Sequence, residues 1–191
     1  MSAIFLHNLP TPDSVQHDHV EACEAILQCA GGFVIGSGYF SSVFRMPAVY
    51  VSDGEDVRLE DRVVKLSCGD GGGYHAALAA MEHCEHDPLA PKVYGVRQLS
   101  PDMWAAEMEL LAPLDRNEYG DPTTDTVTNI TGGGFRRIPL DEIIVSSPYL
   151  LAVRELVDKG AADWDVHSYN VMMRGNQPVV SDPCFLMGEI Q

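Results

Sequence analysis

Residues 164–185 read WDVHSYNVMMRGNQPVVSDPCF, and this stretch decides the fold that we expect for the chain. A polar segment is followed by two short apolar runs, which are separated by the turn-forming dipeptide Gly175-Asn176. The pattern predicts a loop, a strand, a turn and a second strand. Side chains that carry oxygen ligands stand on both sides of the predicted hairpin: Asp165, Asn170 and Asp182.

The spacing of these three residues is typical of phosphoryl transfer. In the catalytic loop of protein kinases an aspartate accepts the proton of the substrate hydroxyl, and an asparagine five positions later holds Mg²⁺. Asp165 and Asn170 have that spacing, and Asp182 follows the hairpin where kinases place a second metal-binding carboxylate. Mg²⁺ prefers hard oxygen ligands and retains several waters, so one carboxylate, one amide oxygen and the phosphates of ATP suffice. We therefore expect Asp165 to be the catalytic base, and Asn170 and Asp182 to be the metal ligands.

His167 lies two positions after Asp165, where protein kinases have lysine and small-molecule phosphotransferases often have histidine. Two roles stay open for it at this stage: orienting the γ-phosphate, or hydrogen-bonding within the loop.

A glycine-rich segment, GSGYFSSV at residues 36–43, lies upstream between two predicted strands. Two glycines let backbone N–H groups approach phosphate oxygens, and an aromatic residue at the tip can close over them. Glycine turns in hairpins are common, so this motif alone would not indicate a nucleotide site. With the catalytic segment downstream, we expect contacts to ATP from Gly36, Ser37, Gly38, Phe40, Ser41 and Val43.

Lys65 lies near the end of the apolar strand that is predicted at residues 62–66. An ammonium group that points into a core needs an anionic partner, and in kinases the α- and β-phosphates of ATP supply it. An exposed lysine on an edge strand is the alternative interpretation. The helix predicted at residues 74–84 brings two candidates for the carboxylate partner of this lysine, Glu82 near its flank and Glu85 at its end. We prefer Glu82, and a merely solubilising glutamate is the alternative.

The remaining segments predict an α+β, two-lobed protein-kinase-like fold, in which an antiparallel-sheet N-lobe precedes a much reduced helical C-lobe. We assign residues 1–112 to the N-lobe, with its N-terminal helix and glycine-rich loop, and residues 113–191 to the minimal C-lobe. The other predicted elements are a helix from Asp13 or Ser14 to Gly31-Gly32, strands at PKVYGV (91–96) and MWAAEMELL (103–111), a loop at 117–134 and a helix at 147–159.

Composition excludes several classes of protein. The 191 residues carry 28 acidic and 12 basic side chains, a formal net charge of −16, so the surface as a whole repels nucleic acid and anionic membranes. No apolar stretch is long enough to span a bilayer, and the N-terminus lacks the pattern of a signal peptide. The five cysteines form no CxxC pair. We therefore expect a cytoplasmic protein with free thiols and no direct contact with nucleic acid or membrane.

The chain resembles the early Ser/Thr protein kinases of T-seven-type short-tailed lytic phages. The resemblance runs from about residue 31 to the C-terminus through GSGYFSSVF, RVVKL, APKVYGV and, most closely, WDVHSYNVMMRGNQPVVSDPCF. It implies autophosphorylation and phosphorylation of host proteins, including transcription and RNA-processing enzymes, during infection in the host cytoplasm. By the same resemblance, ATP and Mg²⁺ are the cofactors, Gly36 and Gly38 line the nucleotide site, and Lys65 contacts phosphates.

Three features depart from that family. Asp163 replaces the histidine that usually precedes the catalytic aspartate, and Asp182-Pro183-Cys184 replaces Asp-Phe-Gly. The sequence ends nine residues after Asp182, without the basic C-terminal extension of longer members. Transcription shutoff therefore does not follow from the resemblance, and we do not expect regulation by phosphorylation of an activation segment.

Two other functions compete with a protein kinase. One is a small-molecule phosphotransferase of the aminoglycoside or choline type, which shares the Asp-x-His-x-x-Asn loop but has a larger helical half. The other is a catalytically degenerate kinase fold that sequesters a host protein. If the chain phosphorylates itself, the exposed hydroxyls expected from sequence are Ser41, Ser42, Thr123, Thr124 and Thr126.

Overall fold

A computed structural model describes the chain as two compact units. The first unit comprises Met1–Gly71 and Val93–Leu110, and the second comprises Gly72–Lys92 and Leu111–Gln191. The residues that the structure describes are 3–10, 17–37, 41–53, 56–68, 84, 86–100, 103–114, 126–131, 134–139, 146–160, 162–166 and 170–186.

Both units belong to the α+β class. Every strand pairing in the described ranges is antiparallel, and the helices there are few. No helix in those ranges is long and apolar enough to cross a membrane.

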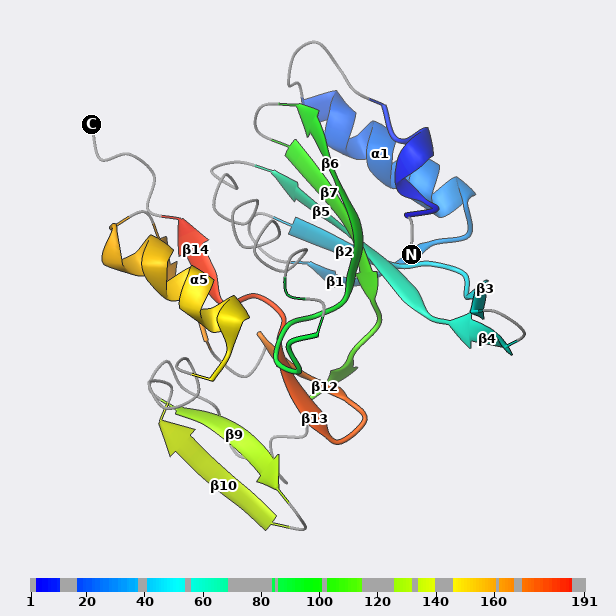
Figure 1. Cartoon of the computed structure of the whole chain (residues 1–191). Helices are drawn as coiled ribbons and strands as arrows, with labels where there is room; N and C mark the ends of the chain where they lie inside the picture. The colour runs from blue at the N-terminus through cyan, green and yellow to red at the C-terminus, as the bar shows by residue number, and fades with distance from the viewer. Residues whose placement is uncertain are drawn as a thin grey trace. The chain divides into compact units, whose positions relative to one another are not determined.

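A five-stranded antiparallel sheet forms the first unit, with strand order β1-β2-β5-β7-β6 (Figure 1). Its strands are β1 (Phe33–Ser37), β2 (Ser41–Arg45), β5 (Arg62–Cys68), β6 (Val93–Ser100) and β7 (Met103–Glu109). The strands that the sequence predicted around the glycine-rich segment, at RVVKL, at PKVYGV and at MWAAEMELL are all present. Their β-branched and apolar residues suit a pleated sheet with one face in a core.

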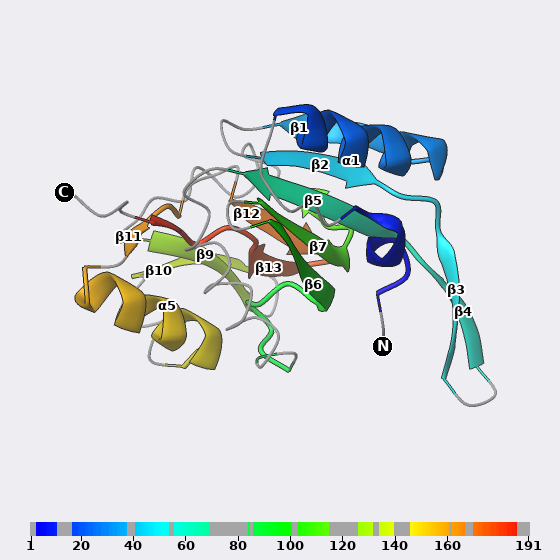
Figure 2. The same ribbon diagram turned by 90° about the horizontal axis from the view of Figure 1, so that it is seen from above.

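The helix α1 (His17–Cys29) covers one face of this sheet (Figures 1 and 2). Cys23 and Leu27 point into the core and are at most 1% exposed, with Val20 and Ile26 packed against its margin. The sheet contributes Phe44, Val64, Leu66, Leu99, Met103 and Ala105 to the same core. The helix predicted in this region is therefore confirmed over His17–Cys29. Gly31, at φ 87°, ends the helix in a conformation that favours glycine.

A buried ion pair lies beneath the N-terminal segment of the first unit. The Glu107 carboxylate accepts hydrogen bonds from the backbone N–H groups of Ile4 (2.7 Å) and Phe5 (2.8 Å), and from the Arg62 guanidinium (2.5 Å). Glu107 and Arg62 are 0% and 1% exposed, and the guanidinium also stacks over the Tyr94 ring at 3.9 Å. The N-terminal segment, with the short helix η1 (Leu6–Asn8), is thus bound to the sheet by charge.

A long hairpin connects two central strands of the sheet. It consists of β3 (Val49–Asp53) and β4 (Asp56–Glu60), which pair only with each other in the described part of the chain. Figure 2 shows the hairpin projecting beyond the sheet and α1.

The second unit contains the helix α5 (Pro148–Asp158) and several short strands. Ser147 caps the helix, since its hydroxyl accepts a hydrogen bond from the Leu150 N–H, and Pro148 occupies the first turn as the sequence predicted. The strands of this unit are β8 (Ala112–Pro113), β9 (Thr126–Thr131), β10 (Gly134–Pro139), β11 (Ala162–Trp164), β12 (Val171–Arg174), β13 (Gln177–Val180) and β14 (Cys184–Leu186).

One prediction of irregular structure in this unit was wrong. We expected a loop at residues 117–134, but β9 begins at Thr126 and pairs with β10 from Thr131↔Gly134 to Thr126↔Pro139. The segment TVTNIT is rich in β-branched residues, which favour strands, whereas the prediction rested on its polarity and the nearby glycines.

Candidate functional site

The segment that the sequence singled out forms two antiparallel strand pairs in the second unit. β11 pairs with β14, through Trp164↔Cys184, and β12 pairs with β13, through Val171↔Val180. The turn between β12 and β13 contains Gly175 at φ 60°, a conformation that favours glycine. The predicted strand, turn and strand are confirmed, whereas Trp164 of the expected loop belongs to β11, and residues 167–169 lie outside the described ranges.

Backbone hydrogen bonds join the chain segments that lie between these two pairs of strands. The Asp165 N–H donates to the Pro183 carbonyl (2.8 Å), and the Ser181 N–H donates to the Asn170 carbonyl (2.8 Å). The Ser181 hydroxyl donates to the same Asn170 carbonyl at 3.1 Å. Asp182 lies between the two residues that make these contacts. The structure therefore brings together Asp165, Asn170 and Asp182, as the spacing of the sequence led us to expect.

The Asn170 amide orients the candidate base. Its Nδ2 donates to the backbone carbonyl of Asp165 (2.8 Å) and to the Asp165 carboxylate Oδ2 (2.9 Å). Asp165 and Asn170 are both partly buried, so these bonds hold the carboxylate in one rotamer. The Asn170 side chain makes these contacts through its nitrogen, and its amide oxygen is an atom of the type that ligates cations.

The pKa of a neighbouring thiol reflects the negative charge of the site. Cys184 is 4% exposed, and its pKa is raised to about 12, first by burial and then by the charges of Asp182 and Asp165. Both carboxylates therefore lie within electrostatic range of the same buried atom. Negative charge gathered in one place is the environment in which a divalent cation is stabilised.

The donor set of this site fits Mg²⁺ in chemical type. Asp182 offers a carboxylate and Asn170 an amide oxygen, which are hard ligands. Among the described residues no group of three or more His, Cys, Asp or Glu side chains forms a metal site. A Mg²⁺ ion that shares its coordination with nucleotide phosphates needs fewer protein ligands than such a group would supply.

The predicted nucleotide residues of the first unit lie in one row across its sheet. Gly36 pairs with Val43, Val43 pairs with Lys65, and Lys65 pairs with Ala106. Cross-strand partners share a face, and the neighbours Phe44 and Val64 on these strands belong to the core under α1. Val43 and Lys65, both half-buried, therefore lie on the sheet face opposite α1.

Gly36 has room for a side chain. Its φ is not positive, and a Cβ at this position would meet only the Val43 Cβ at 3.9 Å, an ordinary contact. The pairing of β1 with β2 shifts register between Val34 and Gly36, and glycine in a strand often marks such a bulge or a close approach of a ligand. Ser37 ends β1 and is exposed, and Ser41 begins β2, half-buried and paired with Ser67.

Four predicted site residues lie outside the described ranges: Gly38, Phe40, Glu82 and His167. The helix predicted at residues 74–84 lies outside them as well, apart from Cys84, so Glu82 as the partner of Lys65 stays a prediction.

Sequence reasoning missed the residues that hold the site in place. Pro183 and Ser181 act through main-chain atoms, and no residue type marks a carbonyl as a partner. It also missed Asp87, which is 7% exposed and accepts hydrogen bonds from the Ser147 hydroxyl (2.6 Å) and the Tyr149 N–H (3.1 Å). An aspartate followed by a proline is only a weak sequence signal for a side chain that accepts hydrogen bonds at the start of a helix.

No protein-family model matches the sequence, and a search of curated proteins finds no match.

Proposed function

We propose that the chain is an ATP-dependent Ser/Thr protein kinase with a small kinase-like fold, and that it phosphorylates host proteins, and itself, during phage infection. One observation carries the proposal: backbone hydrogen bonds of Asp165 to Pro183 and of Ser181 to Asn170 bring Asp165, Asn170 and Asp182 close together. The involvement of a phage and its host rests on the resemblance of the sequence motifs.

Asp165 acts as the base in this proposal. Its carboxylate accepts the proton of a Ser or Thr hydroxyl while the hydroxyl oxygen bonds to the γ-phosphorus of ATP. The bond from that phosphorus to the β,γ-bridging oxygen breaks, and ADP leaves with the electron pair. The Asn170 Nδ2 contact at 2.9 Å keeps the Asp165 carboxylate in the orientation that this transfer requires.

Asn170 and Asp182 are the residues that would hold Mg²⁺, through an amide oxygen and a carboxylate. Bound there, the ion neutralises negative charge on the phosphates of ATP. On the first unit, the row of Gly36, Val43 and Lys65 offers backbone that a phosphate can approach, an apolar side chain and an ammonium group. These are the three kinds of contact that a nucleotide triphosphate uses.

The test is transfer of labelled γ-phosphate from ATP by the purified chain to host lysate and to itself. We expect Asp165→Asn to lower the rate by about 10²–10⁴, the range that a general base contributes, while ATP binding stays nearly unchanged. Asp163→Asn is the matched control, because Asp163 lies on β11 two positions earlier and is exposed. This control should retain full activity.

Three results would contradict the proposal. Undiminished transfer by Asp165→Asn would remove the assigned base. Phosphate that appears on an added alcohol but never on protein would indicate a small-molecule phosphotransferase. Failure to bind Mg·ATP, with an undiminished effect of Lys65→Ala/Asp182→Ala on the host, would indicate a protein that acts by sequestration.

A further inference from the structure

The β3–β4 hairpin exposes an apolar face. Tyr50 pairs with Leu59 and Ser52 pairs with Val57, so these four side chains share one side of the two-stranded sheet. Tyr50 is 75% exposed, Val57 64% and Leu59 58%. Single apolar residues on a surface are ordinary, but three together on a projecting hairpin indicate an interaction surface.

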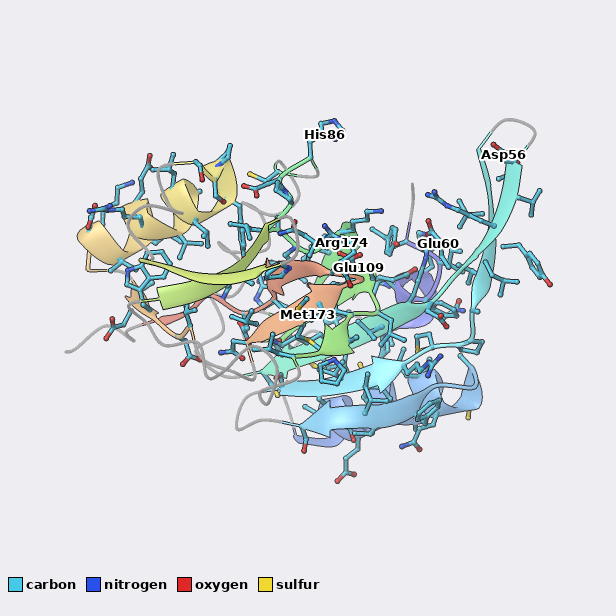
Figure 3. The ribbon with its side chains drawn as sticks, turned by 90° about the horizontal axis from the view of Figure 1, so that it is seen from below. Asp56, Glu60, His86, Glu109, Met173 and Arg174 are labelled. Atoms are coloured by element: carbon cyan, nitrogen blue, oxygen red, sulfur yellow. The ribbon has the colours of Figure 1, made fainter. Side chains whose placement is uncertain are left out.

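A series of charged side chains fixes the base of the hairpin to the five-stranded sheet of the first unit. Glu60 accepts hydrogen bonds from Arg58 on its own strand (3.1 Å) and from buried Arg62 (3.4 Å), and Arg62 in turn pairs with Glu107. Figure 3 shows Glu60 at the base of the hairpin and Asp56 at its far end. The exposed face is thus presented on an arm with an anchored base, which lowers the entropic cost of binding.

The two edges of the hairpin differ in charge. The β4 edge carries Asp56, Arg58 and Glu60, charges of the kind that protect an edge strand from pairing. β3 carries one charged residue, Asp53 at its C-terminal end, and it pairs with β4 alone in the described ranges. A two-stranded hairpin is marginal in water and gains stability from a third strand. The β3 edge is therefore open to an added strand.

Charge selects the kind of strand that can be added. Residues 49–61 contain five carboxylates and one arginine, within a chain of net charge −16. A second copy would bring two such acidic hairpins together, whereas a basic segment is attracted to it.

We propose that the β3–β4 hairpin docks a protein partner through an extended segment in which apolar and basic residues alternate, added along β3. Its apolar side chains cover Tyr50 and Leu59, and its basic ones face the carboxylates of the hairpin. Docking of this kind goes beyond phosphoryl transfer and needs no nucleotide, so the two proposals fail separately.

Fluorescence anisotropy of a labelled synthetic peptide tests the proposal, with the full chain and without ATP. The probe is a short peptide of alternating lysine and valine; one control peptide has glutamate in place of lysine, and another has proline at alternate positions. We expect the lysine–valine peptide to bind and both controls to bind at least about tenfold more weakly, because they lose charge attraction or strand hydrogen bonds.

The protein variants locate the site. Tyr50→Ser/Leu59→Ser should weaken binding about tenfold or more, and Phe33→Ser, at an equally exposed apolar residue of β1 (55%), should leave it unchanged. Because all three side chains are exposed, the variants should keep the thermal unfolding midpoint of the parent chain.

Three results would overturn the inference. They are equal binding of the three peptides, equal loss of binding in Phe33→Ser, and a concentration-dependent dimer that Tyr50→Ser/Leu59→Ser abolishes. The dimer would show that a second copy, and not a basic partner, occupies the hairpin.

Discussion

Replacing Glu107 by alanine should lower the free energy of unfolding of the first unit by about 3–5 kcal/mol. The carboxylate is fully buried and accepts three hydrogen bonds, from the Arg62 guanidinium and from the backbone of Ile4 and Phe5. Its removal leaves the guanidinium in the core with the Glu60 carboxylate at 3.4 Å. Two backbone N–H groups also lose their acceptor.

The magnitude follows from burial. Breaking a buried pair leaves an uncompensated charge, which typically costs about 3–5 kcal/mol, whereas an exposed pair contributes about 0–1 kcal/mol. The chain supplies an exposed pair for comparison, Arg45 with Asp61 at 3.2 Å, with side chains 43% and 52% exposed. Asp61→Ala should therefore change the free energy of unfolding by less than about 1 kcal/mol.

Urea unfolding monitored by fluorescence can isolate the unit concerned. The chain has two tryptophans, Trp104 on β7 of the first unit and Trp164 on β11 of the second. A Trp164→Phe background leaves Trp104 to report on the first unit, and Glu107→Ala is measured in that background against Asp61→Ala. An Arg62→Met/Glu107→Leu double variant should recover most of the loss, since it removes both charges.

Equal, small effects of Glu107→Ala and Asp61→Ala on the free energy of unfolding would refute the reasoning, because breaking the buried pair would then cost no more than breaking the exposed one. A double variant as unstable as Glu107→Ala would refute it as well, because uncompensated charge could not then be the cause.

Four further outcomes are expected. Gly36→Ala should keep the free energy of unfolding within about 1 kcal/mol yet weaken ATP binding, measured by calorimetry, because its Cβ has room in the sheet but would obstruct a phosphate; unchanged ATP affinity would remove Gly36 from the nucleotide site. Gly95→Ala should release the N-terminal segment, because the new Cβ would lie 2.7 Å from the Ala3 Cβ; hydrogen exchange should rise at residues 3–9, and unchanged protection would contradict this. Ser147→Ala should cost about 1–3 kcal/mol in chemical unfolding by removing the cap on Leu150 and a bond to Asp87, while Glu155→Ala on the exposed side of α5 should cost under about 0.5 kcal/mol. The pKa of Tyr94 is raised from 10.0 to about 12 by burial and by Glu60, so its neutral form stabilises the fold, and that contribution is lost as pH rises from about 10 toward 12. Tyr94→Phe should remove this loss from the pH dependence of the urea midpoint. An identical pH dependence in the parent and the variant would contradict the assignment.

Local sequence signals predicted the regular elements well where the signal and the packing agree. Pro148 and Gly160 mark the ends of the region in which α5 forms, and Gly175 marks the turn between β12 and β13. The segment at 126–131 shows the opposite case, because its polar β-branched residues fit both a loop and a strand.

The sequence predicted that three residues of the candidate site lie close together, but it did not predict the contacts that hold them there. The spacing of Asp165, Asn170 and Asp182 around a hairpin suffices to place them together. Sequence gives no signal for the carbonyls of Pro183 and Asn170 that hold them, because every residue carries a carbonyl.

Long-range partners and exposed faces were also beyond sequence reasoning. Arg62 and Glu107 lie 45 positions apart, and nothing in either neighbourhood points to the other. Tyr50, Val57 and Leu59 would each have been assigned to a core by their hydrophobicity, yet they are exposed.

The short-range contacts around Asp165 and Asp182 have a consequence for how the site folds. They join near neighbours in the chain, such as Ser181 with Asn170 eleven positions earlier and Asn170 with Asp165 five positions earlier. Short loops close at small entropic cost, and structures built from them form quickly. The acidic centre can therefore assemble within one short stretch of the chain, residues 165–182.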